Sequence, residues 1–487
     1  MNNSEIASWT EVRAALKKIW GYDNFRPPQG EIVRSLLSKR DALIVLPTGG
    51  GKSICFQLPA LLKTGLTLVV SPLVALMENQ VQELRHLQLS AALLHSELPT
   101  YQRRHTLQAL ERQQLRLLYL SPETLLSVPV WERLSQPQLR INGIILDEAH
   151  CLVQWGDTFR PAYRRLGAVR TTLLRYKPQG TKIAIAAFTA TADPSAQQTI
   201  CKVLQLQKPE IFLISPYRKN LQFRVQTVWT PRGRRQQMLK FIRGKNQQTG
   251  LVYVRSRRDS EELAEWFGQL GYATAAYHAG LSPQQRRNIE ASWLKDKIQF
   301  AVCTCAFGMG INKPDVRWVV HFSPPQLLSE YIQEVGRGGR DGKPAEALTL
   351  VSEPTGWLNP EDKQRCKFFA ANMRSQYQDA QRLVKQLPRQ GEIATVAREF
   401  RDGAVALALL HSANQLEWLD PFYYRQQRSQ QSISLGQLIA KQQQQFNQMN
   451  KYLTTGECRW KFLLRAFGFT QEASGFRCGN CDNCLKH

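Results

Sequence analysis

The chain has 487 residues, of which 43% are hydrophobic and 21% are charged, and it carries a formal net charge of +25. At ~150 residues per domain, this length excludes a single core and indicates about three domains, and the composition is that of a soluble globular protein. The excess of Lys and Arg favours a polyanionic partner, most often nucleic acid, although charge alone leaves open a basic protein without that role.

Two kinds of segment are missing from the sequence. No stretch reaches the ~18 apolar residues that a membrane span needs, and the N-terminal residues Met1 to Gly21 contain no apolar signal-peptide core. We therefore expect a cytoplasmic protein, nucleoid-associated in a bacterium or nuclear in a eukaryote.

Short apolar runs alternate with amphipathic stretches along the first two thirds of the chain. This alternation predicts parallel sheets wrapped by helices, in two tandem α/β domains over residues 1–214 and 215–352. The expected strands are 43–46, 67–70, 115–120, 144–146 and 182–188 in the first domain, and 249–254, 273–277, 300–304, 318–321 and 347–351 in the second. Helices are expected at 260–270 and 283–295.

A glycine-rich loop follows the first strand. Glycines allow the backbone N–H groups to approach phosphates closely, and a Lys and a Ser beside them supply a cation and a hydroxyl. A chance turn with a solvated lysine is the alternative, which the strand–loop–helix context makes less attractive. The expected nucleotide-binding residues of the loop are Thr48, Gly49, Gly50, Gly51, Lys52 and Ser53.

A second apolar strand runs into two adjacent carboxylates, Asp147 and Glu148. Paired with a glycine loop, such carboxylates supply a Mg²⁺ ligand and a base for the attacking water. Asp147 and Ser53 are therefore the expected Mg²⁺ ligands, and Glu148 is the expected base. Together, the two motifs predict a protein that binds and hydrolyses a nucleoside triphosphate.

After residue 352 the pattern changes to helices, and we expect a helical and winged-helix-like region over 353–450. Helical runs at 392–400 and 404–413 precede short apolar strands at 416–419 and 422–424. This order is typical of a winged-helix module, with an ordinary helical appendage as an equal alternative. Within the glutamine-rich segment 426–450, apolar residues keep a helical spacing and predict one long helix.

Four of the 10 cysteines lie close to the C-terminus, and the other six are interpreted as reduced thiols in apolar surroundings. Cys458, Cys478, Cys481 and Cys484 suit a tetrahedral, structural Zn²⁺ site in a module over 451–487. An iron–sulfur cluster is a competing interpretation, whereas disulfides are disfavoured in the cytosol. His487 is a weaker candidate ligand.

Further segments lie in a recognisable order along the chain: 21–29, the Asp-Glu-Ala-His box at 147–150, 151–163, 189–192, 277–281, 304–313 and 333–342. With the glycine loop and the cysteines, they resemble the RecQ family of DNA helicases, in helicase superfamily 2. The resemblance implies two RecA-like parallel-sheet domains followed by a helical or winged-helix-like segment and a zinc-binding module.

The resemblance also implies roles for individual residues. Tyr22, Arg26 and Gln29 would recognise adenine, while Gln333 would sense the nucleotide and Arg337 and Arg340 would stabilise charge in the transition state. His150 and Thr189 would couple the nucleotide site to DNA, and His278 would contact the DNA backbone. The loop that carries Trp155, Phe159 and Arg160 would stack on single-stranded bases, which its polar, aperiodic sequence independently favours.

The expected function is thus that of an ATP-dependent DNA helicase that moves 3′→5′ on single-stranded DNA and opens fork or overhang duplexes in DNA repair or recombination. ATP, Mg²⁺ and Zn²⁺ are its expected cofactors. Two alternatives remain. One is an RNA helicase with the same two motor domains, and the other is an ATP-controlled nucleic-acid-binding or strand-annealing factor with weak unwinding.

Overall fold

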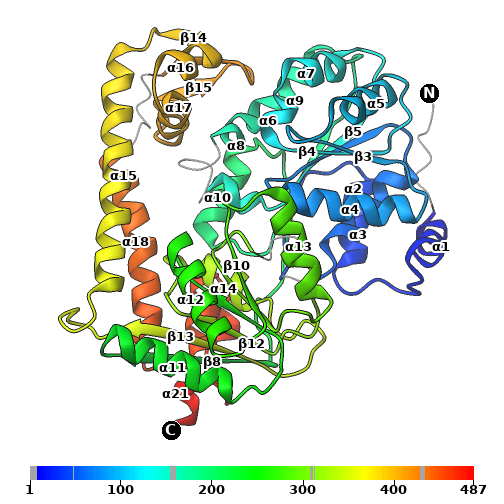
Figure 1. Cartoon of the computed structure of the whole chain (residues 1–487). Helices are drawn as coiled ribbons and strands as arrows, with labels where there is room; N and C mark the ends of the chain where they lie inside the picture. Colours follow the sequence, from blue (N-terminus) through cyan, green and yellow to red (C-terminus); the bar gives the residue numbers. More distant parts are fainter. Residues whose placement is uncertain are drawn as a thin grey trace. The chain divides into compact units, whose positions relative to one another are not determined.

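The computed structural model describes residues 8–47, 49–153, 161–307, 311, 313–427 and 434–486. The chain forms two compact units: the first contains Met1–Ile214 and Ser375–Ile439, and the second contains Ser215–Arg374 and Ala440–His487 (Figure 1). The region expected over 353–450 is therefore shared between the units, and the domain boundaries stay a prediction. None of the described helices is long and apolar enough to cross a membrane.

The first unit is built on a seven-stranded parallel sheet in the order β3-β4-β2-β5-β6-β1-β7. The five strands expected here are confirmed, whereas β3 and β7 were not predicted from the sequence. The strands are β1 (Ala42–Val45), β2 (Leu66–Val70), β3 (Ala91–Leu94), β4 (Leu117–Leu120), β5 (Ile141–Leu146), β6 (Ala184–Thr189) and β7 (Glu210–Leu213).

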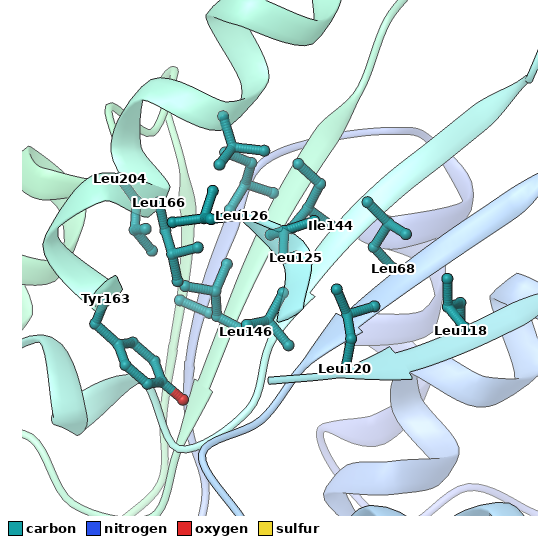
Figure 2. Packing of buried hydrophobic residues seen from close by; sticks show 14 of the residues in the cluster. Leu68, Leu118, Leu120, Leu125, Leu126, Ile144, Leu146, Tyr163, Leu166 and Leu204 are labelled. Carbon is teal, nitrogen blue, oxygen red and sulfur yellow. The ribbon is translucent and has the colours of Figure 1, made fainter. Parts of the chain in front are cut away.

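Helices cover both faces of this sheet, which is why its inner strands are apolar at every position. Along β2, Leu68 belongs to one buried cluster and Val69 to the other. Figure 2 shows the first cluster, in which Leu68, Leu120 and Leu146 project from neighbouring strands. The helices are α1 (Trp9–Trp20), α2 (Gln29–Leu37), α3 (Lys52–Leu62), α4 (Val74–His86), α5 (Thr100–Glu111), α6 (Pro122–Leu125), α7 (Val128–Ser135), α8 (Ala162–Arg165), α9 (Val169–Arg175) and α10 (Pro194–Val203), with 3₁₀ turns at Ala149–Leu152 and Leu166–Ala168.

A small inserted module, residues 387–427, packs on the first unit. It follows the long helix α15 (Glu361–Gln386) and forms an antiparallel sheet in the order β14-β16-β15, with two helices. The expected helices and hairpin are confirmed, and the third strand favours a winged-helix arrangement over a simple helical appendage. The elements are β14 (Gln390–Glu392), α16 (Ile393–Glu399), α17 (Gly403–Ser412), β15 (Leu416–Trp418) and β16 (Tyr423–Gln426).

Contacts with α7, α8 and α10 hold the inserted module in place. The rings of Trp131 and Phe422 meet edge to face, with centroids 5.3 Å apart. Arg165 donates to the carbonyl of Pro421 at 3.2 Å. Helix α17 contacts α8, and its residues 406–410 are all buried. The module is therefore joined to the first unit by both apolar and polar contacts.

The second unit contains a six-stranded parallel sheet in the order β10-β11-β9-β12-β13-β8. Its five expected strands and both expected helices are confirmed, whereas β8 was not predicted because its burial is irregular. The elements are β8 (Leu221–Val228), α11 (Pro231–Arg243), β9 (Gly250–Tyr253), α12 (Arg257–Gln269), β10 (Thr274–Tyr277), α13 (Pro283–Leu294), β11 (Phe300–Cys303), β12 (Trp318–His321), α14 (Leu328–Val335) and β13 (Ala345–Ser352).

The C-terminal helices pack on the edge of this sheet at β8. Trp460 is buried against Phe223, with ring centroids 4.6 Å apart, and its indole N–H donates to the carbonyl of Leu221 at 3.3 Å. The long glutamine-rich helix is confirmed as α18. The helices are α18 (Leu435–Thr454), α19 (Arg459–Ala466), α20 (Thr470–Ala473) and α21 (Asp482–Leu485).

Candidate nucleotide and metal sites

The glycine loop leads from β1 into α3, which begins at Lys52. Gly51 has a φ of +72°, and a Cβ there would lie 2.3 Å from Nε2 of Gln29, so only glycine fits. Gln29 donates to the carbonyls of Gly50 and Gly51 at 3.2 and 3.4 Å and accepts from the backbone N–H of Arg26 at 2.9 Å. The segment expected to recognise adenine is thus tied directly to the loop expected to bind phosphate.

Tyr22, Arg26 and Gln29 lie on the segment that joins α1 to α2 and on the first position of α2. The Tyr22 ring is half exposed, which leaves one of its faces available to a base. Residues 49–53 of the loop are described, and Ser53 is the second residue of α3. Thr48 lies outside the described residues.

A chain of polar side chains connects the loop to the end of β5. Lys52 Nζ lies 3.4 Å from Oε1 of Glu148, and the other carboxylate oxygen of Glu148 lies 3.2 Å from Nδ1 of His150. The same ring nitrogen lies 3.1 Å from the hydroxyl of Thr189. The structure therefore brings together the predicted cation, base and coupling residues in one network of the first unit.

The two carboxyl groups at the end of β5 have different proton affinities. Burial raises the pKa of Asp147 to about 6. Burial acts on Glu148 in the same direction, but the charge of Lys52 and the hydrogen bond with His150 outweigh it and hold the pKa of Glu148 below its ordinary range. Adjacent groups with separated pKa values are typical of sites that divide acid, base and ligand roles.

Glu148 also adopts a left-handed backbone conformation, with a φ of +51°. This conformation is uncommon for a residue with a side chain and is held where the surroundings determine it. The carboxylate of Asp147 is 4% exposed and accepts from the N–H of Glu148 at 3.0 Å. A buried carboxylate oxygen is the ligand type that Mg²⁺ prefers, so Asp147 fits its predicted role.

In the second unit, the predicted arginines lie just after α14, which ends at Val335. Arg337 is 8% exposed, and Arg340 donates to the carbonyl of Ile311 at 3.0 Å. Gln333 lies on α14 itself. The three residues thus occupy one helix and the turn after it, and their action on the nucleotide stays a prediction.

Sequence reasoning missed the buried network that holds α14. Glu334 accepts from Arg255 Nη1 and Nη2 at 3.0 and 2.6 Å and from His321 Nε2 at 2.9 Å. Arg255 follows β9 and His321 ends β12, and these strands are neighbours in the sheet. The carboxyl ends of parallel neighbours meet at one edge, so polar residues just after two apolar strands were an available signal.

Of the residues predicted to contact DNA, the structure describes His278 but not those of the aromatic loop. His278 is 4% exposed, lies 2.9 Å from a carboxylate oxygen of Glu261, and accepts from the N–H of Gly280 at 3.2 Å. Its predicted role at the DNA backbone stays a prediction. Trp155, Phe159 and Arg160 lie outside the described residues.

The four C-terminal cysteines come together, with all four sulfurs within 4.8 Å of one another. Tetrahedral ligands at ~2.3 Å from Zn²⁺ lie ~3.8 Å apart, and the sulfurs of Cys478 and Cys484 are 3.9 Å apart. Backbone N–H groups approach two of the sulfurs, from Cys478 to Cys458 at 3.3 Å and from Arg459 to Cys481 at 3.5 Å. The geometry fits Zn²⁺ held by thiolates, while His487 lies outside the described residues.

An ion pair fixes this cluster to the second unit. Arg459 donates to both carboxylate oxygens of Asp482 at 2.6 and 2.8 Å. Asp482 in turn accepts from the N–H of Val225, on β8, at 3.0 Å. Arg459 and Asp482, which adjoin Cys458 and Cys481 in the sequence, therefore attach the cysteine cluster to β8.

Comparison with known proteins shows the family of the chain. The chain is 53% identical over 481 residues to the ATP-dependent DNA helicase RecQ of Synechocystis, and the match covers 99% of each chain. The chain belongs to the RecQ family of ATP-dependent DNA helicases. It is 38% identical to the RecQ helicase of Pasteurella multocida over 72% of this chain, but it spans only 55% of that protein.

Three family profiles match different parts of this RecQ-family chain. Residues 26–200 match the DEAD/DEAH box helicase profile, 233–342 the helicase conserved C-terminal domain, and 424–485 the RecQ zinc-binding profile. Among solved structures, the helicase Lhr of Mycobacterium smegmatis bound to ssDNA and AMP-PNP is similar, with a TM-score of 0.58 at 18% identity. That match covers 86% of this chain and 60% of Lhr, and it confirms the two-domain helicase fold.

Proposed function

We propose that this RecQ-family helicase binds ATP with Mg²⁺ at the glycine loop and uses hydrolysis to move 3′→5′ along single-stranded DNA and to open fork or overhang duplexes. The observation that carries the proposal is the network from Lys52 through Glu148 and His150 to Thr189. It joins a phosphate cation to the base and to the segment that couples hydrolysis to DNA.

The loop supplies the phosphate site. Backbone N–H groups of Gly49 and Gly51 and the N-terminus of α3 would bind the phosphates, and Gln29 and Arg26 would read the base beside Tyr22. The N–H of Gly50 donates to the carbonyl of Pro47 at 3.0 Å instead. Lys52 moves from the Glu148 carboxylate to the phosphate oxygens when the triphosphate binds. Glu148 is then released from its ion pair and accepts a proton from the attacking water.

Asp147 and Ser53 would hold Mg²⁺, which would supply positive charge to offset the charge that develops on the phosphates. Burial favours the neutral form of Asp147, so a divalent cation and the ionised carboxylate stabilise each other there. Magnesium binding would therefore balance the negative charge of the ionised Asp147 carboxylate.

Gln333, Arg337 and Arg340 belong to the second unit and act on the nucleotide from there. Arg337 and Arg340 stabilise the charge on the transferring phosphoryl group, as an arginine finger does. The ion pair of Glu334 with Arg255 keeps α14 rigid, so these groups are positioned before ATP arrives. The proposed domains are 1–214 and 215–352 for the two motor domains, 353–450 for the helical and winged-helix-like region, and 451–487 for the zinc module.

DNA engages through both motor domains. Trp155, Phe159 and Arg160 stack on bases of one strand, His278 approaches the backbone, and His150 with Thr189 reports strand contact to Glu148. In the zinc module, Cys458, Cys478, Cys481 and Cys484 ligate a structural Zn²⁺, which leaves no open position for chemistry. We place the protein in the cytoplasm, at the nucleoid.

The test is an ATPase and strand-release assay on the full chain. We expect ATP hydrolysis stimulated by single-stranded DNA, and release of a labelled strand from a fork. Both are lost in Lys52→Ala, whose hydrolysis falls ~10²-fold or more because a phosphate cation is removed. An exposed control, Lys208→Ala, keeps parental rates.

Two results would redirect the proposal. Hydrolysis without strand release on forks and overhangs of either polarity would leave the ATP-controlled binding or annealing factor. Stronger stimulation and unwinding with RNA than with DNA would favour an RNA helicase.

A further inference from the structure

Large aromatic side chains are exposed near one end of the sheet in the second unit. Trp357 is 89% exposed, Phe368 is 62% exposed, and Trp229 is 62% exposed. Trp229 directly follows β8, and the turn that carries Trp357 follows the adjacent strand β13. Large aromatic rings that are exposed at one end of a domain are candidates for a binding surface.

Hydrogen bonds hold the turn that carries Trp357 in a defined conformation. Glu353 accepts from the backbone N–H groups of Thr355 and Leu358 at 2.6 and 3.0 Å, and Lys363 on α15 donates to the carbonyl of Thr355 at 3.3 Å. These contacts hold the turn on both sides of Trp357. The ring is therefore presented to solvent by an ordered segment.

The helix that follows this turn, α15, contributes its first turns to an open groove of about 740 Å³, whose other walls are α11 and α12. Figure 1 shows these helices in the green and yellow part of the second unit. The groove-lining residues that matter here are Arg232 and Arg235 from α11, Arg258 from α12, Phe322 at the end of β12, and Arg365 and Phe368 from α15.

A buried arginine fixes the groove. Arg234 is fully buried and donates to Asp362 at 2.7 Å, to the Ser352 hydroxyl at 2.7 Å and to the carbonyl of Phe322 at 2.7 Å. These bonds attach the start of α15 to α11 and to the sheet. The groove is thus preorganised, which lowers the entropic cost of binding a ligand there.

The charge of this region favours an anionic ligand. Helix α11 contains five basic residues and no acidic residue, and only Arg234 among its basic residues is buried. Acidic residues also line the groove, and Glu262 pairs both with Arg258 at 2.5 Å and with Arg235 at 3.8 Å. Arg232 and Lys367 are exposed and make no ion pair with the described residues, so both are available to phosphates.

We infer that this α11–α15 groove is a second contact surface for single-stranded DNA, separate from the aromatic loop expected at 151–163. Phe368 in the groove and Trp357 on the turn that precedes α15 stack on bases, while Arg232 and Lys367 contact phosphates. Aromatic platforms beside basic side chains bind single strands without sequence preference. The inference rests on the proposed helicase function, and it adds base stacking in the second unit to the backbone contact proposed for His278.

The experiment measures binding of a fluorescent oligothymidylate to the full chain over a range of salt concentrations. The double variant Trp357→Ala/Phe368→Ala should bind at least about fivefold more weakly, since a stacked base contributes at least that factor. Arg232→Gln/Lys367→Gln should lower the slope of log affinity against log salt by about 1.4, at ~0.7 for each phosphate that the protein no longer neutralises.

Matched controls come from an exposed part of the first unit. Tyr101→Ala removes a ring that is 70% exposed on α5, and Arg112→Gln removes an exposed charge at the end of the same helix. Both should bind as the parent does. Zinc content and circular dichroism of every variant should equal those of the parent.

A second measurement maps the contact directly. An oligonucleotide with 5-iododeoxyuridine should photo-crosslink to the peptide that contains Phe368 or the one that contains Trp357. Parental affinity and salt slope in both double variants, with crosslinks only elsewhere, would overturn the inference. If the parent chain showed no DNA-stimulated ATPase activity, the proposed function would be contradicted instead. The failure of the inference and the failure of the proposed function are therefore distinguishable.

Discussion

Replacing Glu334 by Gln should destabilise the second unit strongly. Glu334 is 4% exposed and is the carboxylate partner of Arg255. Burial alone would raise the pKa of Glu334, but the charge of Arg255 and the hydrogen bond from His321 outweigh it and hold that pKa at about 2, below its usual 4.5. A tenfold change in proton affinity corresponds to ~1.4 kcal/mol, so the ionised form gains about 3 kcal/mol in the folded state.

Removing one partner of a buried ion pair typically costs about 3–5 kcal/mol, which agrees with that figure. The pH dependence follows from the lowered pKa of Glu334. Its contribution to the free energy of unfolding is complete above pH 4.5 and is lost as the pH falls from 4.5 towards 2. Glu334→Gln should lack this component, because an amide does not titrate.

Urea unfolding of the full chain, combined with hydrogen exchange of peptides from α14, measures the effect in the second unit. Glu334→Gln should lose about 3 kcal/mol at pH 7, whereas Glu265→Gln, an exposed change on α12, should stay within about 0.5 kcal/mol. A loss below 1 kcal/mol, or equal acid sensitivity of the variant and the parent, would refute the reasoning.

Three further predictions concern other sites. Phe422→Ala removes the ring that meets Trp131 and should cost about 1–3 kcal/mol, seen as faster hydrogen exchange in residues 387–427; unchanged exchange would contradict the docking. Cys481→Ser should release Zn²⁺ and loosen α19, and elemental analysis that finds no zinc in the parent would end that assignment. Trp155→Ala should keep the basal ATPase rate but lose its stimulation by DNA, and full stimulation would exclude the coupling role.

Local motifs were predictable from the sequence because their chemistry lies in consecutive residues. The glycine loop, the carboxylate pair after β5 and the cysteine run each place their groups within a few positions, so spacing alone indicated them. The cluster of Cys458 with Cys481 also follows, since one ligand set requires them to meet. Their positions in the structure agree with that expectation.

Contacts between distant segments were not predictable in the same way. Glu334 and Arg255 are 79 positions apart in the sequence. No local pattern indicates which buried acidic residue pairs with which basic residue. Strands β3 and β7 were missed because one is short and alanine-rich and the other is a half-exposed edge strand. The contacts of the inserted module with α7, α8 and α10 likewise depend on packing that periodicity does not reveal.

The inward placement of α17 has a consequence for how this helicase treats base sequence. In helix-turn-helix proteins the second helix enters the major groove and reads base edges. Here that helix contains Gly403, five alanines and leucines in a row at 406–410, and no long polar side chain apart from His411. A helix with so few donors and acceptors cannot distinguish one base pair from another. Helix α17 therefore does not read base sequence in the way that a recognition helix does, which suits an enzyme that must pass every sequence in its path.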